Sequence, residues 1–134
     1  MHTTSMAGSV AMERDYGAMR LIVGPRAAEA PSSTIDLKVL ELEPGASTSR
    51  HYHRRSESVF CVLEGEVEVE SRTRRRMPVG AVAVVPAGDL HQVHNVGAQR
   101  CRVLEIMSPP FSKDDYLFDV DGSPPSVASG ATVR

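Results

Sequence analysis

The sequence predicts an all-β domain, built from short strands as a sandwich or a barrel. Six segments are rich in Val, Leu and Ile or alternate apolar with polar residues. Each is bounded by Gly, Pro, Asn or Ser, which favour turns, and no window of a dozen residues holds a helical period of about 3.6. At 134 residues the chain is long enough for one core and too short for a second domain beside it.

The predicted strands follow one another at close spacing, at 19–23, 34–43, 58–70, 81–87, 91–96 and 100–107. The alternation is clearest in "EVEVE" (66–70), which sends valines to one face and glutamates to the other. The basic run "SRTRRRMP" (71–78) is interpreted as a solvated hairpin turn.

The two ends of the chain differ from this middle region. Residues 1–17 and 121–134 are rich in small residues, Pro, Ser and Gly, with too little apolar surface to offset the entropy of ordering. We therefore expect a flexible N-terminal arm over 1–17, a β-barrel domain over 18–120 and a flexible C-terminal tail over 121–134.

Composition argues against several classes of partner. The net charge is −2, and there are three Tyr, three Phe and no Trp, so neither nucleic acid nor an anionic membrane is expected to bind. Cys61 and Cys101 each lie in an apolar run and form no CxxC pair, which is typical of reduced, buried thiols. No signal-like start and no run of 18 apolar residues occurs. A soluble cytoplasmic protein is the expectation.

Histidines gather near two of the predicted strands. His51 and His53 stand two residues apart and share one face of a strand, with Glu57 close behind. His91 comes from a later segment, in which His94 points to the opposite face. Imidazole and carboxylate suit Fe, Mn, Ni, Cu or Zn, and four protein ligands leave open positions for a substrate. Each histidine taken alone is more simply a polar surface or core residue.

Taken with their flanks, these residues resemble the two motifs of the cupin superfamily. The first motif, G(X)5HXH(X)3-4E(X)6G, is matched from Gly45 through His51, His53 and Glu57. The second, G(X)5PXG(X)2H(X)3N, is matched at every position by Gly80, Pro86, Gly88, His91 and Asn95. The resemblance covers residues 34–107. It implies an antiparallel jelly-roll β-barrel with one divalent transition metal held by His51, His53, Glu57 and His91.

One spacing departs from the family pattern. Seven residues, not six, separate Glu57 from Gly65, so that counting back from Gly65 places Ser58 in the ligand position. Either a β-bulge lets Glu57 turn inward, or the site has three histidines and water in the fourth place. We favour Glu57, because bulges re-aim side chains and are common beside active sites.

The resemblance implies a metal-dependent enzyme acting on a small organic molecule. Its reaction would be proton transfer of the isomerase, cyclase or dehydratase type, or dioxygenation, with the metal as a Lewis acid. The alternative is a non-catalytic cupin that binds a sugar or another small effector. We expect a homodimer, with the segment "AMRLIV" (18–23) as an edge that pairs across the interface.

Overall fold

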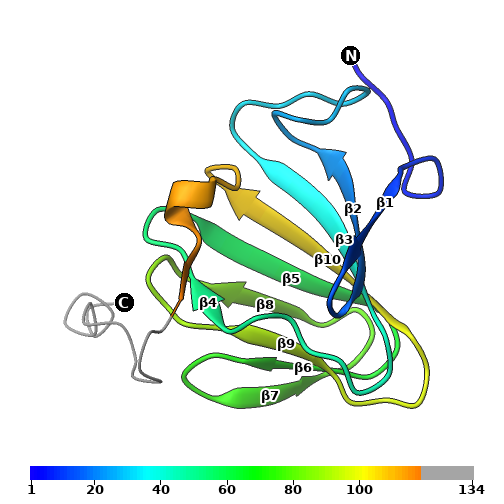
Figure 1. Cartoon of the computed structure of the whole chain (residues 1–134), viewed down its shortest axis with the longest axis vertical. Coiled ribbons are helices and arrows are strands. Elements are labelled where there is room, and N and C mark those ends of the chain that lie inside the picture. The colour runs from blue at the N-terminus through cyan, green and yellow to red at the C-terminus, as the bar shows by residue number, and fades with distance from the viewer. Residues whose placement is uncertain (119–134) are drawn as a thin grey trace.

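The structure is a computed structural model, and it describes residues 1–118. Within these residues the chain is almost entirely strand (Figure 1). The elements are β1 (Ala11–Arg14), β2 (Gly17–Val23), β3 (Asp36–Leu42), β4 (His51–Tyr52), β5 (Glu57–Glu64), β6 (Val67–Glu70), β7 (Arg74–Met77), β8 (Val82–Val85), β9 (Gln92–Asn95), β10 (Cys101–Ser108), the 3-10 helix η1 (Lys113–Asp115) and β11 (Leu117–Phe118).

The strands form three antiparallel sheets around one core. The largest has the order β1-β2-β3-β10-β5-β8, a second has the order β7-β6-β9, and β11 pairs with β4. Figure 1 shows the three-stranded sheet and β4 on one side of the six-stranded sheet, with η1 near one end of β5 and β10. The antiparallel jelly-roll architecture predicted from the sequence is confirmed.

The core lies between the two larger sheets, because alternate residues of each point inward. Phe60 and Val62 on β5 are 1% exposed, and Val103 on β10 is fully buried. The three-stranded sheet contributes Val67 and Val69, as the alternation in "EVEVE" predicts. Burial of such side chains stabilises the fold by about 1.5–3 kcal/mol each.

The segment 58–70, expected as one strand, is divided at Gly65. This residue has φ +90°, and a Cβ placed there would lie 2.7 Å from Cys101 Cβ. Glycine therefore allows the chain to turn from β5 into β6 directly against β10. Cys61 and Cys101 are both free, and Cys101 is buried.

The basic run 71–78 is not only a turn. Its second half forms β7, which pairs with β6 in register from Val67 opposite Met77 to Glu70 opposite Arg74. Arg74 forms an ion pair with Glu68, and Arg76 reaches Glu66 at 2.9 Å. Opposite charges on facing strands therefore stabilise a strand that local apolar patterning does not indicate.

The expected N-terminal arm, 1–17, includes a short strand. Residues 11–14 form β1 and pair with β2, and Arg20 Nη1 donates to the carbonyl of Ser9 at 2.6 Å. Because β2 lies between β1 and β3, the segment 18–23 is an interior strand, and the edges of this sheet are β1 and β8. The expected C-terminal tail, 121–134, lies outside the described residues. In residues 1–118 we find no helix with the length and hydropathy needed to cross a bilayer.

Candidate metal centre

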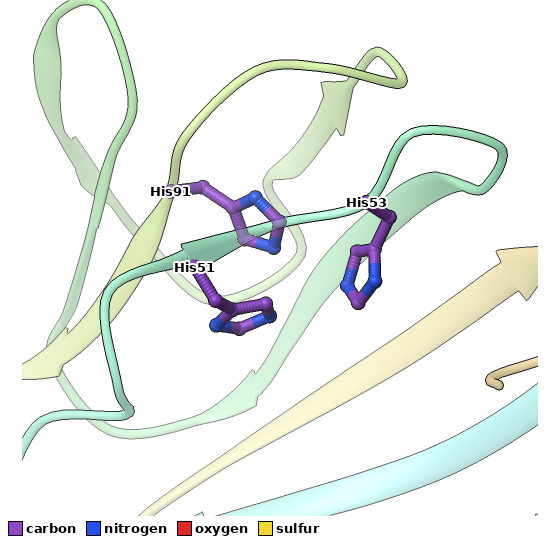
Figure 2. A group of neighbouring side chains, drawn as sticks. All are labelled: His51, His53 and His91. Carbon is purple, nitrogen blue, oxygen red and sulfur yellow. The ribbon is translucent and has the colours of Figure 1, made fainter. Parts of the chain in front are cut away.

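Three histidines from two neighbouring segments converge on one point. His51 lies on β4, His53 follows that strand, and His91 immediately precedes β9. The backbones of His51 and His91 exchange two hydrogen bonds, of 3.1 and 2.8 Å. One ring nitrogen from each of the three residues lies within 4.8 Å of the others. Figure 2 shows the three rings turned toward a common space.

Each ring is oriented by a backbone carbonyl. The Nδ1 atoms of His51, His53 and His91 lie 2.8, 2.8 and 2.9 Å from the carbonyl oxygens of Ser49, Asp115 and Asp89. A carbonyl only accepts, so each Nδ1 carries the hydrogen and each Nε2 presents a lone pair. Nε2 of His53 and Nε2 of His91 are buried and have no hydrogen-bond partner in residues 1–118. Three oriented imidazoles, two of them with buried and unpartnered Nε2 atoms, fit a divalent transition metal.

Burial keeps the rings of His51 and His91 in the form that binds a metal. Desolvation, followed by the proximity of His91, lowers the pKa of His51 to about 3. Burial also lowers the pKa of His91. Both rings are therefore neutral at physiological pH, as metal ligation requires.

His53 is held by a segment that sequence reasoning did not connect with the site. Its acceptor is the carbonyl of Asp115, at the end of η1. The buried Asp115 carboxylate accepts from the backbone N–H groups of Arg54, Arg55 and Ser56 at 2.8, 3.1 and 3.3 Å. The loop after β4 and the chain after β10 are thus joined by one aspartate. No local pattern in the sequence marks this residue.

The structure does not bring Glu57 to the three histidines. Glu57 is the first residue of β5 and is exposed, whereas the next residue, Ser58, is 1% exposed and points inward. The pairing of β5 with β10 is regular from Glu57 to Val62, so no bulge re-aims the glutamate. Ser58 Oγ has no hydrogen-bond partner in residues 1–118. The arrangement matches the three-histidine alternative.

His94 lies on the other face of β9, as the alternation predicts. Its Nδ1 is 2.6 Å from Ser47 Oγ, and its Nε2 is 2.9 Å from Glu70 Oε1. The hydrogen bond from His94 is the main reason that the pKa of Glu70 is lowered. Both ring nitrogens are therefore engaged away from the histidine cluster.

The three histidines line a cavity of about 260 Å³. Apolar side chains such as Leu40, Phe60 and Met107 form much of its wall. Tyr116 stacks on His51 with ring centroids 4.5 Å apart, and its hydroxyl hydrogen-bonds with Ser49 Oγ. A small, mostly apolar cavity with a few polar groups is typical of a binding site for a small organic molecule.

The cavity also contains polar residues that sequence reasoning missed. Lys38 on β3 and Glu105 on β10 both line it, and both are 6% exposed. Glu105 lies in a strand that otherwise sends apolar residues inward, whereas β3 is buried on both faces and Lys38 shares its face with Leu40 and Leu42. The signal in the sequence is a charged residue at an inward position, which is recognised only once the facing direction of the strand is known.

Comparisons with known proteins agree with this architecture. The family model described as "Cupin domain" matches residues 38–107. The chain is 30% identical over 114 residues to the polyketide synthase CurC of Streptomyces cyaneus, covering 84% of this chain and 71% of that protein. It is 29% identical over 114 residues to the tetracenomycin polyketide synthase protein TcmJ of Streptomyces glaucescens, covering 80% of this chain and 75% of that protein.

Solved structures with the same fold include proteins from other bacteria. A protein from Planctomyces limnophilus superimposes with a TM-score of 0.69 at 18% identity, covering 88% of this chain and 96% of that one. The protein TT1209 from Thermus thermophilus gives a TM-score of 0.67 at 25% identity, covering 83% of this chain and 100% of that one. With its two motifs, its antiparallel barrel and this family match together, the chain belongs to the cupin family.

Proposed function

We propose that this cupin is a metal-dependent enzyme that catalyses proton-transfer chemistry on a small polyketide-like molecule. The observation that carries the proposal is the convergence of three oriented imidazoles at the wall of a cavity, with the Nε2 atoms of His53 and His91 unpartnered. A structural histidine would use both ring nitrogens within the protein, as His94 does.

His51, His53 and His91 would hold the metal. Once bound, a divalent transition metal supplies Lewis-acid chemistry to a carbonyl or enol oxygen of the substrate. The protein's own contribution is orientation and exclusion of water. The backbone carbonyls hold the three rings, while Phe60 and Tyr116 pack against His91 and His51 and limit the space beside them.

The names of the two relatives suggest the substrate class. Both are called polyketide synthase proteins, and polyketide chains carry many carbonyl and enol oxygens. The apolar walls of the cavity suit the carbon skeleton of such a molecule. This favours a cyclisation or isomerisation step over dioxygenation.

Elemental analysis tests the metal centre first. We expect about one divalent metal per chain in the wild-type protein purified near pH 7.5, because neutral imidazoles bind metal. His53→Ala should lose it. His94→Gln is the matched control and should retain the metal, as should Glu57→Ala, since both side chains point away from the cluster. A wild-type protein that takes up no metal after reconstitution would overturn the metalloenzyme proposal.

Product analysis tests the enzymatic step. Adding the metal-loaded protein to a reconstituted polyketide synthase that releases a reactive poly-β-ketone should change the distribution of cyclised products. The His53→Ala variant should leave the distribution as it is without the protein. If the wild-type protein binds metal and still leaves the products unchanged, the non-catalytic binding cupin is the better description.

A further inference from the structure

The cavity contains two charged groups for which the protein supplies no hydrogen bond. Lys38 and Glu105 face each other across the pairing of β3 with β10 in the six-stranded sheet. The histidines belong to segments outside that sheet, so these two groups line a different part of the cavity wall. Figure 2 shows the ribbons of β3 and β10 passing below the three rings.

The contacts of Lys38 and Glu105 are too long for hydrogen bonds. Lys38 Nζ is 4.0 Å from Glu105 Oε1 and 4.0 Å from Asp36 Oδ2. Asp36 Oδ2 accepts instead from the backbone N–H of Phe111 at 3.1 Å. Within residues 1–118, we find no hydrogen bond to the ammonium of Lys38 or to the carboxylate of Glu105, although Lys38 Nζ also lies 5.1 Å from the centroid of the Phe111 ring. Both residues are more than nine-tenths buried.

Glu41, a buried carboxylate on the same strand pair, differs from Glu105 in being hydrogen-bonded within the protein. Glu41 is also 6% exposed, and it does not line the cavity. It accepts a hydrogen bond from Arg20 at 3.1 Å and lies 3.3 Å from Arg102. Buried charges cost several kcal/mol unless they are paired and hydrogen-bonded. Lys38 and Glu105 are paired only at 4.0 Å, so both keep hydrogen-bonding capacity that a molecule in the cavity can use.

We propose that Lys38 and Glu105 form a second recognition site, which binds a carbonyl or enolate oxygen next to a hydroxyl group of the substrate. Lys38 donates to the carbonyl or enolate oxygen, since an ammonium has donors only. Glu105 accepts from the neighbouring hydroxyl. The substrate class is then a hydroxy ketone or hydroxyaryl ketone, and this assignment rests on the proposed function of the cavity as a small-molecule site.

Calorimetric titration of the full chain with two probes tests this site. The probes are ortho-hydroxyacetophenone, which has a carbonyl beside a hydroxyl, and acetophenone, which has the carbonyl alone. The wild-type protein should bind the hydroxy ketone more tightly. Glu105→Gln should remove most of that preference, and Lys38→Met should weaken binding of the hydroxy ketone about 10- to 100-fold, as expected for a lost charge-assisted hydrogen bond.

Glu41→Gln is the matched control, because it neutralises an equally buried carboxylate on β3 that lies outside the cavity. It should leave both affinities unchanged. If a single variant fails to fold, the double variant Lys38→Gln/Glu105→Gln replaces both charges with neutral amides and should show the same loss of preference. Unchanged affinities in the folded variants of Lys38 and Glu105 would show that the pair is only structural.

Metal content measured on the same samples separates this inference from the proposed function. Lys38→Met and Glu105→Gln should retain the metal content of the wild-type protein, because neither residue belongs to the histidine cluster. A wild-type protein without metal that still prefers the hydroxy ketone would overturn the metalloenzyme proposal and support the second site. Full metal content without any preference between the probes would support the metal centre and overturn the second site.

Discussion

Asp115 connects the folding of the chain after β10 with the orientation of a metal-site histidine. Its carboxylate accepts hydrogen bonds from the backbone N–H groups of Arg54, Arg55 and Ser56. Its backbone carbonyl accepts a hydrogen bond from His53 Nδ1. Asp115→Ala removes the carboxylate but keeps the carbonyl. The substitution therefore removes the carboxylate contacts between η1 and the loop after β4 without changing any histidine.

The expected loss of stability follows from these contacts. Hydrogen bonds to a charged group contribute about 1.5–3 kcal/mol each, and they are not additive when they share one acceptor. Arg54 and Arg55 are exposed, so water can replace the hydrogen bonds that their N–H groups lose. Ser56 is 2% exposed, so its lost hydrogen bond is not replaced in this way. We therefore expect Asp115→Ala to lower the free energy of unfolding by about 3 kcal/mol.

Urea unfolding followed by far-ultraviolet circular dichroism measures this loss, and metal affinity measures the effect on His53. Loss of a group that orients a ligand typically weakens metal binding about 10- to 100-fold. Asp114→Ala is the neighbouring control, because its side chain is 73% exposed and reaches only the exposed Arg55 and Ser112. It should change neither quantity measurably. An Asp115→Ala protein as stable as the Asp114→Ala protein would refute the reasoning.

Three further predictions concern stability. The pKa of His51 is lowered to about 3 in the folded protein, below the value of about 6.5 in the unfolded chain. Between these two pH values, His51 is protonated in the unfolded chain but not in the folded one. In the metal-free protein, His51 should therefore lower the free energy of unfolding as pH falls, by about 2 kcal/mol at pH 5. Urea titrations at several pH values should show the loss, and a His51→Gln variant with an equally steep pH dependence would contradict it. Phe60→Ala should lower the free energy of unfolding by about 3–5 kcal/mol, measured by thermal or urea unfolding, because Phe60 is 1% exposed in the core. A loss below about 1 kcal/mol would mean that neighbouring side chains fill the space left by the phenyl ring. Gly65→Ala should lower the free energy of unfolding by roughly 2–4 kcal/mol, since the residue has φ +90° and an added Cβ would lie 2.7 Å from Cys101 Cβ. Gly45→Ala should lower it by about 1–2 kcal/mol, because Gly45 has φ +77° but an added Cβ would meet nothing within 4 Å. Equal losses at the two glycines would remove the role assigned to the close approach.

Strands that carry an apolar alternation could be predicted from the sequence. The segments 34–43 and 100–107 correspond closely to β3 and β10, because their inward residues pack into the core whatever their partners are. β7 could not be predicted in this way. Its arginines are exposed, and the strand depends on glutamates of β6 that face it only after the hairpin has formed.

The site was predictable where the facing direction of a side chain follows from local alternation. His51 and His53 share a face because they are two residues apart, and His94 points away from His91 because those two are three residues apart. The direction of Glu57 could not be predicted, because it depends on whether a bulge occurs at the start of β5. Lys38 and Glu105 become neighbours only through the pairing of β3 with β10.

The groups that hold the three histidine rings belong to the backbone. Every one of the three Nδ1 atoms has a main-chain carbonyl as its acceptor, from Ser49, Asp89 and Asp115. A carbonyl is present whichever amino acid occupies the position, so a substitution there cannot delete the acceptor unless it moves the chain. Substitutions of side chains around the cavity could therefore change the molecule that is bound while leaving the tautomers of the three imidazoles, which the backbone fixes, as they are.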